Sequence, residues 1–343
     1  TVGWVHAARF VNWLNTSKGF VAAYKFDTQP GELNYNSSEN ISLWEPGEVG
    51  FDSSNRFRNS LAKYFLPSMN EWYKAAFYDP NTNAGAGGYW DYPTGSDAPP
   101  TPVASGTDAL ELALRACGIS SGDVVFTVSH TAVATVAAIE SAGATPVLLD
   151  IDQETLTLDP LVLEQAIDSE WGERARAVVP VHLYGYPAAM REINKVARQA
   201  GLFVIEDCAQ AQGAELFGRK VGSWGDIAAF SLYPTKNLGA FGDAGMVVTE
   251  SKKLANRVRQ LRQYGWQNSN ISKIPGRNSR LDEIQAAMIR EILPKLDEMN
   301  ERRRDIARQY TDAFNDMAIR VPACREEVLH VFHQYVIRHE QRD

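Results

Sequence analysis

From residue 104 onward, amphipathic helical patterns alternate with short apolar runs rich in β-branched residues. The segment 108–119, "DALELALRACGI", has helical periodicity, and 123–128, "DVVFTV", is typical of a strand. The same alternation continues through expected helices at 131–143, 160–169 and 188–201, and expected strands at 145–151, 175–185, 202–207, 226–232 and 245–250. This order predicts an α/β fold, a mostly parallel sheet wrapped by helices. Several of the runs are apolar throughout, as expected for strands covered on both faces.

The sequence on either side of this region has a different texture. Residues 280–314 form one long helical pattern, which we expect to bend at Pro294. Residues 330–338 alternate as a strand, so we assign 104–290 to a large domain and 291–343 to a long helix and the start of a small α+β domain. Residues 1–103 are rich in Trp, Tyr, Asn, Gly and Pro, with helices expected only at 5–15 and 68–78.

Composition narrows the classes of function. A chain of 343 residues has room for two or three domains. Its net charge of −8 disfavours nucleic acid or an anionic membrane surface as the main partner. No apolar run approaches the ~18 to 20 residues of a membrane span. Three distant cysteines, Cys117, Cys208 and Cys324, indicate free thiols in a reducing compartment, so we expect a cytoplasmic protein, and we predict no metal site.

Two polar stretches stand where an open α/β sheet binds its ligands, at the carboxyl ends of strands and at helix N-termini. In the first, Ser105, Gly106 and Thr107 begin an expected helix, so their amides and hydroxyls suit a phosphate or simply cap the helix. In the second, Asp207 follows a buried strand, with Gln210 three residues later. A carboxylate there either pairs with a protonated pyridine nitrogen or caps the next turn.

Two further stretches carry basic groups. In "SLYPTKNLGAFGDAG", Ser231 precedes Lys236 by five residues, and a lysine framed by a proline turn and glycines can form a Schiff base with an aldehyde. Burial would assist by lowering the pKa of its amine. The alternative is a solvated surface lysine. In "PGRNSRLDEIQAA", Asn278 and Arg280 precede a helix, where they either bind a phosphate or cap that helix.

Together these stretches resemble the fold-type I pyridoxal-phosphate enzymes, and more closely the DegT/DnrJ/StrS family of sugar aminotransferases. The resemblance rests on "SGTDALELALRACGISSGDVV", "VVPVHLYG", "VIEDCAQAQGAELFGRKVGSWGDIAAFSLYPTKNLGAFGDAGMVVT" and "GRNSRLDEIQAA", and extends from residue 104 to about 340 in family order. The block 204–249 makes it specific because it is long and detailed.

The resemblance implies pyridoxal 5′-phosphate as the cofactor. Lys236 would bond covalently to its aldehyde and then shuttle a proton, and Asp207 would pair with the pyridine nitrogen, which makes the ring an electron sink. Gln210 would approach the phenolic oxygen. The phosphate would be held by Gly106, Thr107, Asp108 and Ser231.

The same resemblance implies a homodimer, because in the family Asn278 reaches the phosphate of the neighbouring subunit. The implied reaction moves an amino group from an amino acid, typically glutamate, onto a nucleotide-linked keto-deoxysugar. Tyr184 and Arg280 would line the substrate side. We expect His182 to be a buried, hydrogen-bonded residue instead. His130 either stacks on the cofactor ring or has a capping or packing role, since Ala132 stands where many members have an aromatic residue.

Other readings remain open at this stage. A pyridoxal-phosphate sugar dehydratase has the same fold, but those relatives carry histidine in place of the lysine. Residues 1–103 resemble the formylglycine-generating, sulfatase-modifying family, a C-type-lectin-like fold, without its catalytic cysteines. The chain would then be a chimera joined near "TPVASGTDAL". A truncated, fused chain of this kind can instead be inactive and act as a binding or interaction protein.

Overall fold

A computed structural model describes residues 8–9, 11–12, 15–26, 42–53, 55–56, 58–63, 78–79, 88–89, 101–268, 271–314 and 317–339. The chain divides into two compact units, Thr1–Tyr89 and Trp90–Asp343. Residues 101–103 lie in the second unit, although the sequence placed them in the first, because they pair with a strand of the large sheet. Among the described helices, none is both long enough and apolar enough to span a bilayer.

The first unit has a small apolar cluster of its own. Its members are Ala8, Val11, Ala23, Tyr24, Phe26 and Ala62. Within the predicted helix 5–15, the described residues 8–9, 11–12 and 15 are helical, and the helix continues to residue 16. Most of the predicted helix 68–78 lies outside the described residues, and its last residue belongs to β1 (Tyr78–Asp79), which pairs antiparallel with β2 (Gly88–Tyr89).

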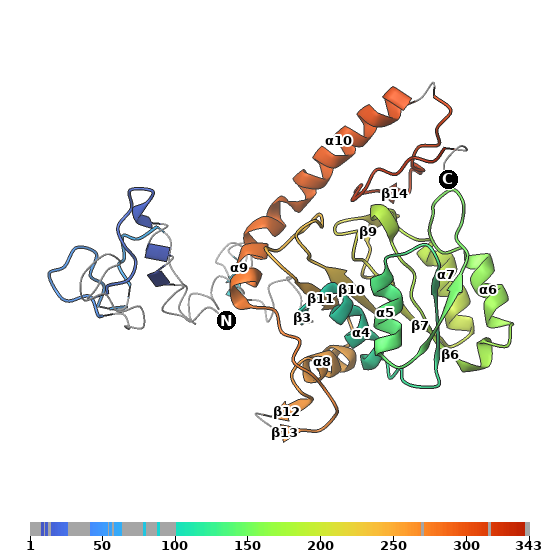
Figure 1. The fold of residues 1–343 in the computed structure, drawn as a ribbon, viewed down its shortest axis with the longest axis horizontal. Coiled ribbons are helices and arrows are strands. Elements are labelled where there is room, and N and C mark those ends of the chain that lie inside the picture. Colours follow the sequence, from blue (N-terminus) through green and yellow to red (C-terminus); the bar gives the residue numbers. More distant parts are fainter. Residues whose placement is uncertain are drawn as a thin grey trace. The chain divides into compact units, whose positions relative to one another are not determined.

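The second unit is built on a seven-stranded sheet with the order β3-β11-β10-β7-β6-β4-β5 (Figure 1). The strands are β3 (Thr101–Val103), β11 (Gly245–Val248), β10 (Ile227–Ser231), β7 (Phe203–Asp207), β6 (Ala175–Val178), β4 (Val124–Val128) and β5 (Thr145–Leu149). All pairings from β10 to β5 are parallel, and β11 runs antiparallel to both β10 and β3. The predicted α/β fold with a mostly parallel sheet is confirmed.

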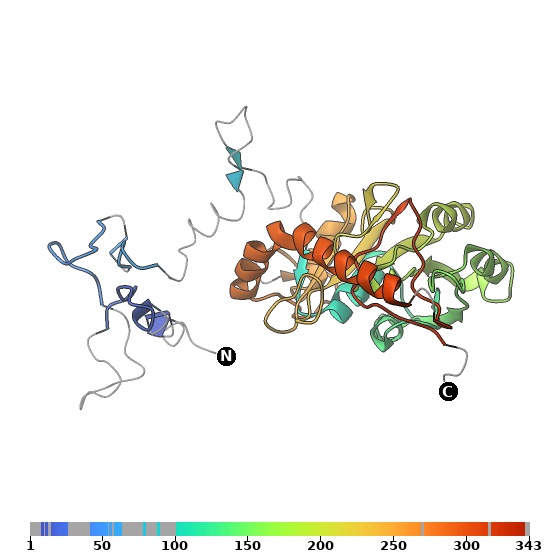
Figure 2. The same cartoon turned by 90° about the horizontal axis from the view of Figure 1, so that it is seen from above.

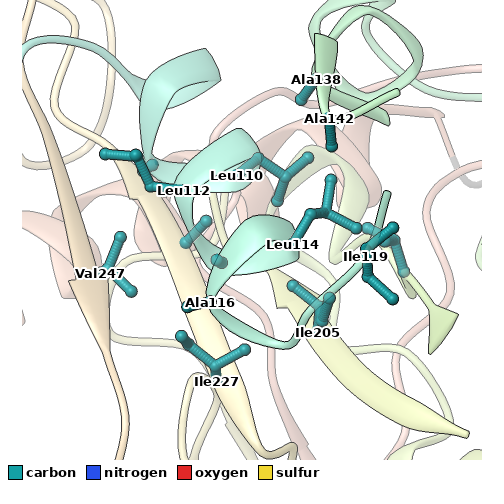
Figure 3. Close-up of a cluster of buried hydrophobic side chains, with 14 of the residues drawn as sticks. Leu110, Leu112, Leu114, Ala116, Ile119, Ala138, Ala142, Ile205, Ile227 and Val247 are labelled. Atoms are coloured by element: carbon teal, nitrogen blue, oxygen red, sulfur yellow. The ribbon is translucent and has the colours of Figure 1, made fainter. Parts of the chain in front are cut away.

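Helices cover both faces of this sheet. One face carries α4 (Gly106–Ala116), α5 (Val133–Ser141) and α8 (Lys252–Leu261), and the other carries α6 (Pro160–Ile167) and α7 (Met190–Gln199). Side chains alternate along β4, so Val125 joins the first core and Phe126 the second. Figure 3 shows leucines of α4 packed against strand residues such as Ile205, Ile227 and Val247.

Helix α4 begins at a strong N-terminal signal. Ser105 Oγ accepts a 3.1 Å hydrogen bond from the amide of Asp108, and this cap satisfies one of the first-turn donors. Asp108 lies in the first turn and Arg115 in the last, the arrangement that the helix dipole favours.

The C-terminal helical pattern is interrupted at the predicted place. It consists of α9 (Glu283–Ile292), the 3-10 turn η3 (Leu293–Lys295) that contains Pro294, and α10 (Leu296–Phe314). Helix α10 continues as a long straight element, and the C-terminal segment returns beside it (Figures 1 and 2). Tyr335 holds the segment there, with its hydroxyl 2.8 Å from Thr311 Oγ1 and its ring beside that of Tyr310.

The prediction of a strand over 330–338 is wrong. The strand β14 (Val328–Leu329) ends before this range and pairs with β8 (Glu215–Leu216), which pairs in turn with β9 (Arg219–Lys220). Within 330–338, Arg338 forms an isolated antiparallel bridge with Arg320. Beyond β14 the backbone bonds to loops: the amide of Val331 donates to Gly185 O and that of Gln334 to Tyr184 O. These loop contacts replace a ladder.

Some elements were not expected from the sequence. They are α8, the hairpin of β12 (Trp266–Asn268) and β13 (Ile271–Ser272), and the 3-10 turns η1 (Gly172–Arg174) and η2 (Leu183–Gly185). The strand predicted over 175–185 ends at Val178, because Pro180 cannot donate to a ladder and Tyr184 has a φ of 59°.

Candidate active site

The predicted site residues gather at one edge of the sheet. Ser231 ends β10 and Asp207 ends β7, while His130 and Tyr184 follow β4 and β6. These strands are parallel, so their carboxyl ends share an edge. Helix α4 begins at the same edge, because β3 runs in the direction of β10. Ligands bind at such an edge in open α/β sheets.

The N-terminus of α4 lies directly on the ends of β10 and β11. A Cβ added at Gly106 would lie 2.6 Å from Ser231 Cβ, and one added at Gly245 would collide with the carbonyl of Ser105. Glycine is therefore required at both positions for the helix to approach this closely. The amides of Gly106 and Thr107 are first-turn donors without intrahelical acceptors, and we refer to these amides together with Ser231 Oγ as the anion cup, because donors at a helix N-terminus suit an anion.

Asp108 points to a different partner. Its amide is taken by Ser105, and its carboxylate is bound by Arg277 and by Ser279 Oγ, the latter at 2.6 Å. Arg277 also contacts Glu111 at 2.8 Å. This leaves the amides of Gly106 and Thr107, and not Asp108, as the open donors of the cup.

The segment that carries Arg277 and Ser279 also carries the other predicted phosphate contact. Asn278 and Arg280 are both exposed, and Arg280 Nε donates a 3.0 Å hydrogen bond to Asn278 Oδ1. Asn278 and Arg280 are therefore neighbours in sequence of Arg277 and Ser279, which bind Asp108 at the start of α4. Their own side chains are exposed to solvent.

Asp207 is a buried carboxylate held in one orientation. Its Oδ1 accepts from the amide of Ala209 at 3.1 Å, and its Oδ2 accepts from Thr135 Oγ1 at 2.9 Å. Burial raises the pKa of Asp207 above its usual value, and the two donors oppose that shift without cancelling it. A cationic group placed beside it would favour the ionised form.

Lys236 extends from the loop after β10. Its amide donates to Tyr233 O at 2.8 Å, which makes a tight turn. Burial lowers the pKa of its amine, while the negative charge of Asp207 acts in the opposite direction. The structure therefore brings the predicted lysine and carboxylate into electrostatic contact, and it gives the lysine an amine that is easier to deprotonate than a solvated one.

His130, Tyr184 and Gln210 form a connected group. The Tyr184 hydroxyl is 3.1 Å from His130 Nε2, and the two rings meet edge to face at 5.7 Å between centroids. Gln210 Oε1 accepts from the Tyr184 amide at 2.7 Å. Tyr184 has a left-handed backbone, which costs energy for a non-glycine residue and is held by this hydrogen bond.

His182 is fully buried, as expected. Its Nδ1 accepts from the amide of Ala188 at 2.9 Å, so Nε2 carries the proton and donates to Glu206 at 3.1 Å. Cys208 lies within 4.8 Å of this pair, a spacing that a metal ion could use. Both ring nitrogens of His182 are already bonded, and burial raises the pKa of the Cys208 thiol well above its usual value.

Sequence reasoning missed three residues near the site. Thr135 bonds to Asp207, Asn237 lies buried next to Lys236, and His333 reaches Asn237 with Nδ1 and Oδ1 3.1 Å apart. The spacing of Thr131 and Thr135, four residues apart in an expected helix, was the available signal for the first, although in the structure Thr131 precedes α5. Nothing local marked the other two, because both act through long-range contacts.

Residues 100–343 match the family model described as the DegT/DnrJ/EryC1/StrS aminotransferase family. The chain belongs to this family. Its matched region contains all of the site described above, and the predicted family is confirmed for this part of the chain.

Several characterised proteins are similar to the chain. A dTDP-3-amino-3,4,6-trideoxy-alpha-D-glucose transaminase of Streptomyces venezuelae is 46% identical over 242 residues, which is 70% of this chain and 63% of that protein. The crystal structure of S. venezuelae DesV in complex with a ketimine intermediate has a TM-score of 0.68 at 45% identity and covers 71% of this chain and 65% of that one.

A second solved structure was determined with a cofactor. It is NtdA from Bacillus subtilis with bound PMP, which has a TM-score of 0.63 at 32% identity and covers 69% of this chain and 54% of that one. The chain thus spans less than two thirds of the length of these relatives: 63% of the transaminase and 65% and 54% of the two solved chains.

Proposed function

We propose that this chain is a pyridoxal-phosphate-dependent aminotransferase. It would move an amino group from an amino acid, for which glutamate is the first candidate, onto a nucleotide-linked keto-deoxysugar. The observation that carries the proposal is the position of Lys236 close enough to Asp207 for their charges to act on one another, at the sheet edge where α4 begins. The similarity of the chain to the sugar transaminase from Streptomyces venezuelae and to PMP-bound NtdA also supports the proposal.

The residues present fit the cofactor. The cup of Gly106, Thr107 and Ser231 offers amides and a hydroxyl to a phosphate, at a point where a single added Cβ would fill the space. Asp207 is buried and its pKa is raised, because the charge of Lys236 and the hydrogen-bond donors only partly offset the effect of burial. A protonated ring nitrogen beside it would stabilise the ionised form. When bound, pyridoxal phosphate supplies a ring that withdraws electrons from the carbon next to the transferred nitrogen.

The protein's own groups would divide the remaining work. Lys236, whose pKa is lowered by burial, would hold the cofactor through its aldehyde and would carry the proton that moves during the transfer. Asp207, fixed by Thr135 and Ala209, would accept a hydrogen bond from the protonated ring nitrogen and so favour its protonated form. His130 would face the ring, and its edge-to-face contact with Tyr184 supports this by restricting the orientation of the imidazole.

The substrate side and the assembly belong to the same proposal. Tyr184 and Arg280 would contact the nucleotide-linked sugar, and Gln210 would approach the phenolic oxygen of the cofactor. The exposed Asn278 would reach the phosphate of a partner subunit in a homodimer. The free thiols of Cys117, Cys208 and Cys324 support a reducing compartment, and we place the protein in the cytoplasm.

An absorbance spectrum tests the proposal. Purified protein is incubated with pyridoxal phosphate, beside Lys236→Ala and, as a matched control, Lys220→Ala, whose lysine pairs with Glu215. We expect a band at roughly 400 to 430 nm that borohydride abolishes and only Lys236→Ala lacks. Glutamate should then shift this band toward the pyridoxamine form. A folded protein without the band would remove the enzyme assignment and favour the alternative, an inactive chain with a binding or interaction role.

The first unit carries a separate proposal. Its separation as a compact unit, and the start of the family match at residue 100, are compatible with a fusion in which residues 1–103 come from a sulfatase-modifying-like, C-type-lectin-like protein. The comparisons add no support for that origin. A continuous sequencing read across the codons for residues 90–120 decides whether the two halves are joined in the gene.

A further inference from the structure

The loop that presents Lys236 is closed tightly at its base. The amide of Ala240 donates to Leu232 O at 2.7 Å, and the amide of Lys236 to Tyr233 O at 2.8 Å. A Cβ added at Gly239 would lie 2.6 Å from Pro234 O, so the two sides of the loop are in contact. The backbone on either side of Lys236 is thus constrained, and the next residue anchors the far end of the loop.

That residue, Asn237, is buried to 1% exposure and its amide group is fully used. Its Nδ2 donates to Asn300 Oδ1 at 2.8 Å and to Val331 O at 3.0 Å. Its Oδ1 lies 3.1 Å from His333 Nδ1. One side chain therefore ties the lysine loop to α10 and to the C-terminal segment.

Asn300 carries the network onward to the other parts of the site. It is also 1% exposed, and its Nδ2 donates to Gln212 O at 2.9 Å. Gln212 Nε2 in turn donates to Ser231 O at 2.5 Å and to Ala209 O at 3.2 Å. Ser231 belongs to the anion cup, and the Ala209 amide holds Asp207. Three buried amide side chains thus connect the lysine, the cup and the carboxylate.

We infer that Asn237 and Asn300 are positioning residues for Lys236. A buried polar network of this kind fixes one geometry, because removal of any member leaves the others unpaired in a medium of low dielectric constant. Asn237 sets where the loop places the lysine amine, and Asn300 acts on the lysine through Asn237. The inference deepens the proposed function, since it rests on Lys236 being the reacting amine.

The test measures the reactivity of Lys236 in the protein without pyridoxal phosphate. Competitive labelling with acetic anhydride across a pH series, read by mass spectrometry of the Lys236 peptide, yields the midpoint pH at which the amine becomes reactive. Burial lowers this midpoint and the negative charge of Asp207 raises it. His333 of the C-terminal segment interacts electrostatically with Lys236 and with Arg303 of α10. A loosened loop admits water to the amine, so its pKa should return upward toward the ordinary value.

We expect Asn237→Ala and Asn300→Ala each to raise the midpoint by about one unit, a tenfold change in acidity. The double variant should add little beyond either single one, because both act through one network. Asn194→Ala is the matched control: its Nδ2 also donates to two carbonyls, of Met190 and Trp224, but on α7. The control should leave the midpoint unchanged.

Outcomes separate this inference from the proposed function. If folded Asn237→Ala and Asn300→Ala keep the wild-type midpoint, the positioning role is refuted. If Asn237→Ala does not fold, as judged by thermal unfolding, Asn300→Ala decides, because its side chain touches neither Lys236 nor its loop backbone. The variants can also shift the midpoint although the wild-type protein forms no pyridoxal-phosphate band. That result would uphold the positioning of Lys236 and refute the aminotransferase assignment.

Discussion

Thr135 Oγ1 donates a 2.9 Å hydrogen bond to Asp207 Oδ2 and so joins helix α5 to the end of strand β7. Thr131 Oγ1, one turn earlier, lies 2.8 Å from Thr135 Oγ1 and orients that hydroxyl. Since burial raises the pKa of Asp207, each donor to its carboxylate helps to keep the ionised form accessible. In the proposed function the threonine pair would therefore help Asp207 to stabilise a cationic ring.

Replacement of Thr135 by valine should weaken cofactor binding. The change keeps the shape of the side chain but removes one donor to the charged carboxylate, a contact worth about 1.5–3 kcal/mol. We expect the dissociation constant for pyridoxal phosphate to rise by about 10- to 100-fold. An absorbance titration measures it. Thr135→Ser keeps the hydroxyl and should stay near the wild-type value, and equal binding by all three proteins would contradict the role of this bond.

Replacement of Gly106 by alanine should open the anion cup. The new methyl group would meet Ser231 Cβ and Oγ at 2.6 and 2.8 Å, so α4 must move away from β10. Overpacking of this kind costs about 1–3 kcal/mol, and the displaced amides lose the phosphate. Thermal unfolding and cofactor titration should both register the change.

The control for that variant is Gly242→Ala. An added Cβ at Gly242 would meet only the end of Gln285, no closer than 3.6 Å. We expect stability and cofactor binding within experimental error of wild type. If Gly106→Ala behaves in the same way, the close approach of α4 is not what forms the cup.

Much of the second unit could be predicted from sequence because its signals are local. Apolar runs such as 123–128 and 202–207 and the amphipathic segment 108–119 report burial directly, so strands β4 and β7 and helix α4 were placed correctly. Lys236 and Asp207 are predicted as site residues because their flanking residues are distinctive. These features depend on neighbours in the chain.

What could not be predicted depends on distant partners. Alternation over 330–338 indicated a strand, but the backbone of Val331 bonds instead to Gly185 and Asn237, which are far away in sequence. In the sequence, Asn237 has the character of a polar loop residue. Its burial depends on its contact with the distant Asn300, which the sequence does not reveal. Alternating polarity has no information about which backbone will accept the hydrogen bond.

Removal of the Tyr184 hydroxyl should slow the reaction without abolishing cofactor binding. Tyr184→Phe loses the bond to His130 Nε2 and leaves that ring free to turn. A loss of about 1 kcal/mol of positioning predicts a decrease of roughly fivefold in the rate at which glutamate shifts the cofactor band. Stopped-flow absorbance measures this rate.

Tyr186→Phe provides the comparison for that variant. The Tyr186 hydroxyl is buried, at 5% exposure of the residue, and has no hydrogen-bond partner among the described residues. Its removal should therefore leave the rate unchanged and stability equal or slightly higher. A slower reaction in Tyr186→Phe, with Tyr184→Phe unaffected, would contradict the assignment of the hydroxyl role to Tyr184.

Glu206 makes stability depend on pH at the acid end. Burial by itself raises the pKa of Glu206, but the hydrogen bond from His182 and those from the amides of Gly225 and Gly222 outweigh it, so the pKa lies below the usual value. A carboxyl whose pKa is lower when folded stabilises the protein above its unfolded pKa. That contribution decreases as the pH falls below about 4.5 toward the folded value.

Glu206→Gln should accordingly lower the free energy of unfolding by about 2–4 kcal/mol at pH 7, since an amide nitrogen would face backbone donors. The difference from wild type should shrink in urea unfolding curves recorded at pH 4.5, 4 and 3.5, as the wild-type carboxylate becomes protonated. Glu301→Gln serves as control, because Glu301 pairs with Arg304 and Arg308 at the surface, where such pairs contribute little. A Glu206→Gln deficit that stays constant across this pH range would show that packing, and not the charge on Glu206, is what the substitution removes.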